Sequence, residues 1–299
     1  MPVEFEHLHA AHCESGALTA LLRHEGLRLS EALVFGIGSG LYFLYFPLVK
    51  LYGAPLVAYR DMPNAIIRRA SRRLGFRVAR RTFRAPIDAK RALDDELERG
   101  RPVGLQTGVF WLPYFPRDMR FQFNGHHVVA YARDGDDYLL SDTVFATVVR
   151  CPAEDLERAR FAQGMLAPRG LLYTIELTNR TPDLARAVRA GLATTSARML
   201  GPPIPYLGVR GMRTLANALV RWPDKIGAAS TRAWIASIIR MQEEIGTGGG
   251  GFRFMYAAFL SEAAALLAEP RLEPLAAELS VVGDRWREFA VAGAQGVAV

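Results

Sequence analysis

The chain has 299 residues, 50% of them hydrophobic, which is enough to bury two separate cores, and its formal net charge is +7. Only two cysteines occur, Cys13 and Cys151, so a disulfide-rich secreted protein is excluded and a reducing, cytoplasmic compartment is expected. The start of the chain lacks the basic and apolar stretches of a secretion signal. The apolar run 41–49 is too short to cross a bilayer, so no membrane partner is expected, and the run reads as a buried strand or core segment.

Cys13 stands where the first helical pattern begins. Leu18, Leu21 and Leu22 fall on one face of this predicted helix, and Gly26 ends it. A helix N-terminus offers unpaired N–H groups and a partial positive charge, which favour a thiolate and can also bind an oxyanion. Cys13 is therefore a candidate nucleophile, with a buried structural cysteine as the alternative.

A cluster of arginines follows. Eight arginines and no acidic residue lie between Arg68 and Arg84, on a predicted helix over 63–75 and a predicted strand over 77–83. No nucleic-acid-binding module accompanies them, so nucleic acid is not expected as a partner. A solvated helix face and a docking surface for an acidic protein both remain open.

The next predicted elements are a helix over 86–98 and a strand over 102–106. Residues 107–117, rich in aromatic side chains and prolines, form a predicted loop before the next strand. These aromatic side chains either wall a substrate pocket or pack under a long connection.

A predicted hairpin supplies partners for the cysteine. One strand begins at His126, the Asp134-Gly135 pair marks the turn, and the returning strand ends at Asp142. Antiparallel pairing brings His126 and Asp142 together, and a carboxylate beside an imidazole orients a general base. His127 is the rival base, but alternation along a strand sends the two histidines to opposite faces.

The remaining segments predict a strand over 145–150, a helix over 152–161 and a strand over 170–177. These complete a first domain over 1–178. From residue 179 onward the periodicity is helical, and the second domain, 179–299, is an expected α-helical bundle with helices over 184–200, 211–221, 225–245, 252–267 and 272–291.

Consecutive glycines join two of these helices. Residues 246–251 include Gly248 and Gly249, and Arg253 follows closely. Their backbone N–H groups can converge on an anion, which predicts a site for a substrate carboxylate or for the phosphopantetheine of a partner protein. A flexible linker between helices is the alternative.

The histidines near the N-terminus offer a weak metal signal. His7, His9 and His12 are spaced nearly as in the zinc-ligand run of β-lactamase-like hydrolases, but Ala11 replaces the required aspartate. No metal site is therefore expected.

Taken together, several motifs resemble one family: the N-terminal domain of butirosin biosynthesis protein H and, more distantly, the bacteriocin-processing peptidase domains of ABC exporters. The motifs are His12-Cys13-Glu14-Ser15-Gly16-Ala17-Leu18, the segment 30–45, Gly100-Arg101-Pro102-Val103, Trp111-Leu112-Pro113-Tyr114, Gly125-His126, Ser141-Asp142-Thr143 and, near the end, Gly246-Thr247-Gly248-Gly249-Gly250 with Arg253.

The resemblance implies an α+β, papain-like catalytic domain with an antiparallel sheet, followed by an all-α domain. It also implies a cysteine-dependent acyltransferase that moves an acyl group from an acidic acyl carrier protein to a small amine, without a cofactor of its own. A papain-like peptidase or amidohydrolase shares the same catalytic residues, and a non-catalytic acyl- or peptide-binding module is a further alternative.

One residue departs from the papain-like pattern. Such enzymes commonly carry a glutamine six positions before the nucleophile, where this chain has His7. Either His7 or His9 donates to the oxyanion, or the backbone N–H of Cys13 acts largely alone.

Overall fold

The computed structural model describes residues 4–51, 53–201, 203–245 and 247–297, and it has the mixed α+β architecture expected from the sequence. The chain forms two compact units. Unit 1 comprises Met1–Glu31 and Leu74–Pro182, and unit 2 comprises Ala32–Arg73 and Asp183–Val299. Within the described residues, no helix combines the length and apolar composition that a bilayer crossing requires.

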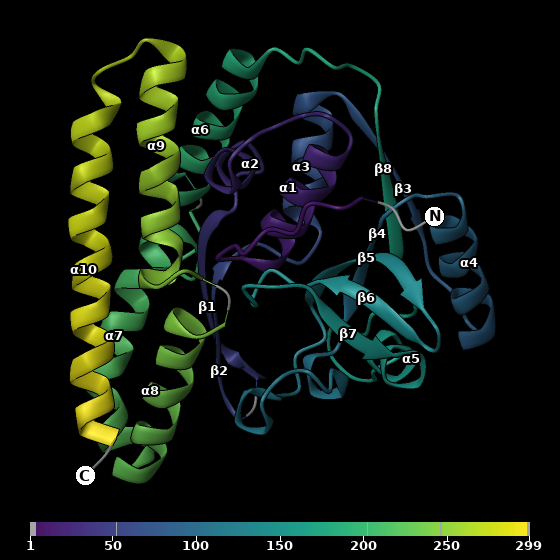
Figure 1. The fold of residues 1–299 in the computed structure, drawn as a ribbon. Coiled ribbons are helices and arrows are strands. Elements are labelled where there is room, and N and C mark those ends of the chain that lie inside the picture. The colour runs from purple at the N-terminus through teal and green to yellow at the C-terminus, as the bar shows by residue number, and fades with distance from the viewer. Residues whose placement is uncertain (1–3, 52, 202, 246, 298–299) are drawn as a thin grey trace. The chain divides into compact units, whose positions relative to one another are not determined.

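Unit 1 is built on an antiparallel sheet with the strand order β3-β8-β4-β5-β6-β7 (Figure 1). The strands are β3 (Phe76–Arg81), β4 (Val103–Thr107), β5 (His126–Asp134), β6 (Asp137–Ser141), β7 (Val149–Pro152) and β8 (Leu172–Leu177). Its helices are α1 (Cys13–His24), α4 (Pro86–Glu98) and α5 (Ala153–Arg160), with short 3-10 turns η1 (Val109–Trp111) and η2 (Arg117–Met119).

Helix α1 begins at Cys13, as the sequence predicts. His12 caps the helix by accepting a hydrogen bond from the Ser15 N–H, which satisfies one of the donors left open in the first turn. Leu18 and Leu22 are fully buried, and α1 packs against β4, β5 and β8. Gly26 ends the segment in the left-handed region with φ of +97°, where a side chain would be strained.

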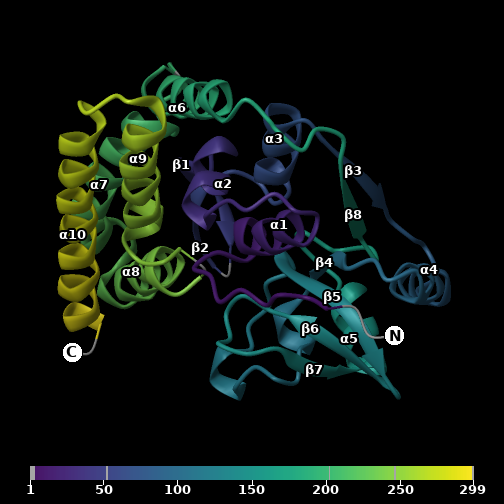
Figure 2. The ribbon, with the colours of Figure 1, turned by 45° about the horizontal axis from the view of Figure 1, so that its top comes forward.

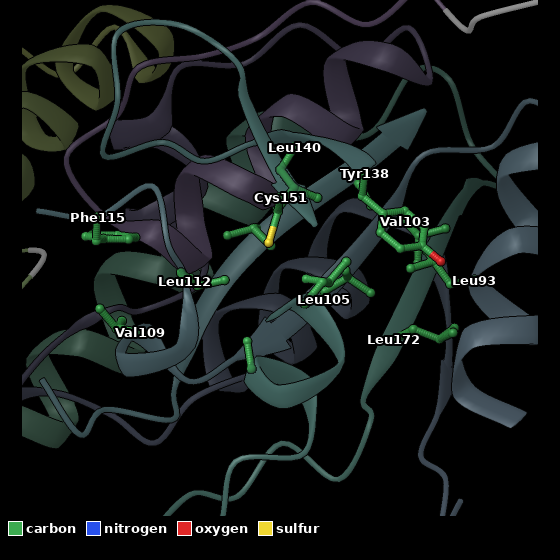
Figure 3. Packing of buried hydrophobic residues seen from close by; sticks show 14 of the residues in the cluster. Leu93, Val103, Leu105, Val109, Leu112, Phe115, Tyr138, Leu140, Cys151 and Leu172 are labelled. Atoms are coloured by element: carbon green, nitrogen blue, oxygen red, sulfur yellow. The ribbon is translucent and has the colours of Figure 1, made fainter. Parts of the chain in front are cut away.

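A hydrophobic cluster, shown in Figure 3, forms the main core of unit 1. Strand alternation places Val128 and Ala130 of β5 in this cluster. Leu93 of α4, Leu156 of α5 and the buried Cys151 also belong to this cluster. The apolar face of the sheet is thus covered by helices, and this fixes the register of β5 and therefore the position of His126.

The predicted hairpin is confirmed by the pairing of β5 and β6, in which Asp134 faces Asp137 across a turn with Gly135 at φ of +61°. The strand predicted over 145–150 is misplaced, because β7 begins only at Val149. The chain turns at this point since the Asp142 carboxylate accepts the Val144 N–H and the Asp142 carbonyl accepts the Phe145 N–H.

Unit 2 combines helices with a two-stranded hairpin, β1 (Leu41–Leu51) and β2 (Ala54–Arg60). Figures 1 and 2 show α9 and α10 packed side by side in this unit. Its helical elements are α2 (Glu31–Ile37), α3 (Ala65–Leu74), α6 (Leu184–Leu200), α7 (Gly208–Ile226), α8 (Ala228–Glu243), η3 (Gly250–Phe252), α9 (Arg253–Leu267) and α10 (Leu272–Val297).

The division of the chain differs from the predicted boundary at residue 178, because residues 32–73 pack with the C-terminal helices. Gly36 of α2 lies so close to the Phe259 ring of α9 that a Cβ would sit 2.1 Å from it. The strand β2, which has no counterpart among the predicted elements, pairs with β1 within the same unit. The first domain was predicted as the continuous segment 1–178, but residues 32–73 of that segment belong to unit 2.

A glycine in β4 allows a test of packing in unit 1. A Cβ on Gly104 would lie 2.1 Å from the fully buried Tyr173 ring, so Gly104→Ala is expected to lower the free energy of unfolding by about 1–3 kcal/mol. Gly296→Ala in α10 meets open space and is expected to stay within about 0.5 kcal/mol of the wild type. Urea denaturation measures both, and equal stabilities would contradict the described approach of β4 and β8.

Candidate active site

Cys13 is held at the start of α1 by a partly buried carboxylate that the sequence gave no reason to expect. Glu31 accepts hydrogen bonds from the N–H groups of Ala11 and His12 at 2.8 and 2.9 Å, and from the Ser15 hydroxyl at 3.0 Å. Burial nevertheless raises the pKa of Glu31 above its ordinary value, against the lowering effect of these bonds. Glu31 thereby fixes the residues immediately before the thiol.

The structure brings His126 and Asp142 together as predicted. His126 Nε2 lies 2.7 Å from Asp142 Oδ2, and both side chains are buried. Because Nε2 faces Asp142, Nδ1 is the ring nitrogen of His126 that remains for another partner, and Cys13 is among the groups that raise the His126 pKa. The Cys13 thiol also lies 4.0 Å from the Gly125 carbonyl oxygen.

The charge of this group is set by competing effects on the histidine. Burial alone lowers the pKa of His126, but the charge and hydrogen bond of Asp142 and the interactions with Cys13 outweigh it and raise that pKa to about 10. The imidazole is therefore held as an imidazolium at neutral pH. Such a cation beside a sulfur atom stabilises a thiolate.

Asp142 has two further donors. Tyr114 donates its hydroxyl to Oδ2 at 3.0 Å, and the Val144 N–H donates to Oδ1 at 3.1 Å. Burial and the neighbouring Asp142 charge raise the pKa of Tyr114 well above its usual range, so the phenol keeps its proton. Tyr114 belongs to the predicted aromatic loop, but only the fold shows that it reaches the carboxylate.

His127 occupies the other side of β5. Its Nδ1 lies 3.3 Å from the Tyr173 hydroxyl, and the ring packs against that of Tyr173. This separation follows from the alternation of side chains along the strand. The geometry therefore favours His126, and not His127, as the base.

The expected oxyanion donor His7 has other partners. Its Nδ1 lies 2.8 Å from Ser141 Oγ, and its Nε2 lies 3.0 Å from the Phe145 carbonyl oxygen. Both ring nitrogens are thus in use, which leaves no ring N–H for an oxyanion. The backbone N–H of Cys13, in the first turn of α1, has no intrahelical acceptor and is the better candidate.

The N-terminal histidines are not gathered around a common centre. His12 Nδ1 faces the Ser15 hydroxyl at 2.9 Å, while His7 bonds the 141–145 segment. Within the ranges that the structure describes, no group of three or more histidine, cysteine, aspartate or glutamate side chains is arranged to hold a metal ion.

The predicted anion site at Gly248, Gly249 and Arg253 lies in unit 2, and Gly246 is outside the described residues. The Gly250 N–H donates to both carboxylate oxygens of Glu243 at 3.1 and 3.2 Å, so the loop already binds a carboxylate from its own unit.

Arg253 is itself fully engaged within unit 2. Its Nη1 donates to the Gly250 and Gly251 carbonyl oxygens at 3.1 and 2.9 Å, and its guanidinium lies over the Trp286 ring. These contacts hold Arg253 within the turn, and an anion site at Gly248, Gly249 and Arg253 stays a prediction.

The predicted arginine cluster is divided between the two units. In unit 2, Arg69 pairs with Asp61, and Arg73 bonds the Ile37 carbonyl and the Ser39 hydroxyl. In unit 1, Arg77, Arg80, Arg81 and Arg84 are exposed, and Arg77 pairs with Glu176. Part of the cluster therefore stabilises unit 2, and part remains available on the surface of unit 1.

A thiol at a helix start and, in the same unit, an imidazolium paired with a buried carboxylate are typical of a cysteine-type enzyme. Residues 12–143 match the family described as "Butirosin biosynthesis protein H, N-terminal", and residues 154–297 match "Domain of unknown function (DUF4872)". The chain thus carries the N-terminal domain of the butirosin biosynthesis protein H family, followed by a second domain that matches its own family model, and this confirms the resemblance noted in the sequence.

Two further comparisons add little. A search of curated proteins found no match. Among solved structures, the chain is similar to one described as a C39-like peptidase from Bacillus anthracis, with 14% identity, a TM-score of 0.37, and coverage of 58% of this chain and 92% of that one. A similarity of this size does not define a fold.

Replacement of the carboxylate tests the electrostatics of the site. Asp142→Asn removes the charge that opposes burial, so the pKa of His126 is expected to fall from about 10 to well below it. NMR titration of the histidine rings, with His126→Gln to assign the signal, measures this change. An unchanged titration in Asp142→Asn would contradict the described pairing.

The raised pKa of His126 also affects the stability of the wild type. The stabilising contribution of protonated His126 is complete below pH 6.5 and is lost as the pH rises through about 10.

The two cysteines are expected to differ in reactivity. Burial, with help from Asp155 and Asp137, raises the pKa of Cys151 to about 12, whereas Cys13 faces the His126 imidazolium. Iodoacetamide at pH 7 is therefore expected to modify Cys13 and to leave Cys151 intact until the protein is denatured. Peptide mapping of the wild type, Cys13→Ala and Cys151→Ala checks this; preferential labelling of Cys151 in the folded protein would refute it.

Proposed function

We propose that this protein is a cysteine-dependent acyltransferase of secondary metabolism. It takes an acyl group from the thioester of a carrier protein and passes it to an amine through an acyl-Cys13 intermediate. The proposal is supported by Cys13 at the start of α1 and by the buried His126–Asp142 pair, in a chain that carries the N-terminal domain of the butirosin biosynthesis protein H family.

In the first half-reaction, the Cys13 sulfur attacks the thioester carbonyl of the donor, and a bond forms between that sulfur and the acyl carbon. The tetrahedral intermediate collapses, and the bond to the carrier thiol breaks. The leaving sulfur takes a proton from the His126 imidazolium, whose orientation Asp142 maintains.

In the second half-reaction, an amine attacks the acyl carbon and the bond to Cys13 breaks. His126, now neutral, accepts the proton that the amine loses, and Cys13 leaves as a thiolate beside the re-formed imidazolium. An amide is the product. In both halves the Cys13 backbone N–H is the proposed donor to the oxyanion, because it opens the first turn of α1.

The proposed donor is an acidic acyl carrier protein, whose phosphopantetheine carries the acyl group, so the enzyme needs no cofactor of its own. Arg80, Arg81 and Arg84 support this choice, because they are exposed on β3 and the residues that follow it. Opposite charges raise the rate of encounter without requiring a large interface.

Hydrolysis of a peptide or amide is the second candidate function. It uses the same acyl-cysteine and differs only in that water removes the acyl group. The similarity to a C39-like peptidase is too weak to favour it. The matching family and the exposed arginines of β3 support transfer from a carrier instead.

Intact-protein mass spectrometry tests the proposal directly. The wild type is mixed with a panel of acyl-carrier thioesters, and a mass increase equal to the acyl group is expected. Cys13→Ala is expected to show no increase. Cys151→Ala, which removes the thiol buried in the core of unit 1, is expected to behave as the wild type. Addition of a small primary amine should discharge the adduct as an amide.

Two outcomes would overturn the assignment. Cleavage of peptides without an adduct from any carrier thioester would assign a peptidase. Full activity of Cys13→Ala, together with ordinary thiol reactivity of Cys13 in the wild type, would assign a non-catalytic binding module.

A further inference from the structure

The segment that carries Asp142 is bonded on both sides by a single side chain. His7 Nδ1 lies 2.8 Å from Ser141 Oγ, one residue before Asp142, and His7 Nε2 lies 3.0 Å from the Phe145 carbonyl oxygen, three residues after it. A carbonyl oxygen only accepts, so Nε2 carries the proton and donates it. Nδ1 of the neutral ring then accepts the Ser141 hydroxyl proton, and one tautomer satisfies both bonds.

A backbone contact extends this connection toward the thiol. The Ala10 N–H donates to the Thr143 carbonyl oxygen at 2.9 Å. Gly16, in the first turn of α1, approaches Thr143 so closely that a Cβ there would lie 2.7 Å from its methyl carbon. Residues 7–16 thus run along the 141–145 segment from His7 to the first turn that holds Cys13.

Beyond Ser141, which ends β6 opposite Val129, residues 142–145 have no strand pairing. Strand β6 ends at Ser141 and β7 begins only at Val149, so local bonds set the conformation between them. Asp142 is fully buried and must meet His126 Nε2 at 2.7 Å. Small displacements of such a carboxylate reorient the imidazole that it holds.

We propose that His7 is a positioning residue: it clamps Ser141 and Phe145 and thereby places the Asp142 carboxylate on His126. The inference rests on the proposed function, since it assigns His7 to the same catalytic group. It replaces the expectation that His7 donates to the oxyanion. His7 acts through Asp142 and does not touch the substrate.

The test separates these two roles by using a reaction that forms no oxyanion. Iodoacetamide alkylates the Cys13 sulfur by displacement of iodide, so an oxyanion donor has no effect on its rate. A residue that positions Asp142 does affect it, because the imidazolium beside the sulfur depends on that carboxylate. The rate of Cys13 alkylation is measured from pH 4 to pH 10 in the Cys151→Ala background.

His7→Ala is expected to move the acidic limb of this profile to higher pH, in the same direction as Asp142→Asn, and to slow alkylation at pH 7 by about 10-fold. Ser141→Ala, which removes one of the two bonds of His7, is expected to give a smaller shift. The double variant should be no more impaired than His7→Ala, because both changes break one clamp. His7→Asn, which can still bond Ser141, should recover part of the rate.

His24→Ala is the matched control, because it removes an imidazole from the last turn of α1 while leaving the 141–145 segment intact. It should retain the wild-type profile, and thermal melting confirms that each variant is folded. Should His7→Ala fail to fold, Ser141→Ala and His7→Asn provide the same comparison.

A wild-type alkylation profile in folded His7→Ala would overturn the proposal. If that variant at the same time lost acylation by carrier thioesters, His7 would be the oxyanion donor instead. The two proposals fail separately: absence of any acyl adduct on the wild type refutes acyl transfer, whereas the alkylation profiles still decide whether His7 positions Asp142.

Discussion

The buried ion pair between His126 and Asp142 is the interaction on which the site depends. A carboxylate with no solvent exposure is costly unless it is paired and fully hydrogen-bonded, and Asp142 meets this requirement through His126, Tyr114 and the Val144 N–H. The same charge keeps the imidazole protonated against the effect of burial. The strand register, the aromatic loop and the turn after β6 must all be in place for this one carboxylate to be satisfied.

On the thiol side of the site, a second, partly buried carboxylate binds the backbone. Glu31 bonds the N–H groups just before Cys13, and it is the last residue of the first segment of unit 1. The chain then leaves for unit 2 and returns at Leu74. Glu31 is therefore both the last residue of this segment and the residue that bonds the backbone just before Cys13.

In unit 2 the backbone polar groups of the glycine-rich loop have hydrogen-bond partners within the unit. Glu243 occupies the N–H of Gly250, and Arg253 binds the loop carbonyls while lying over Trp286. A loop of positive-φ glycines exposes its backbone polar groups, and these groups need partners whether or not a ligand is present. Glu243 and Arg253 thus stabilise the turn from within unit 2.

The sequence by itself determined the helix at Cys13, the hairpin from His126 to Asp142 and the helical character of the C-terminal part, because periodicity and turn residues act locally. It did not reveal that residues 32–73 belong with the C-terminal helices, since a buried face does not state which surface covers it. It did not reveal the hydrogen bonds that Glu31, Tyr114 and Ser141 make in the site, and it gave His7 a role in which its ring nitrogens are not free. Only the tertiary structure decides such partners, because a hydrogen bond between different segments, such as that of Tyr114 with Asp142 or of His7 with Ser141, leaves no pattern in either stretch of sequence.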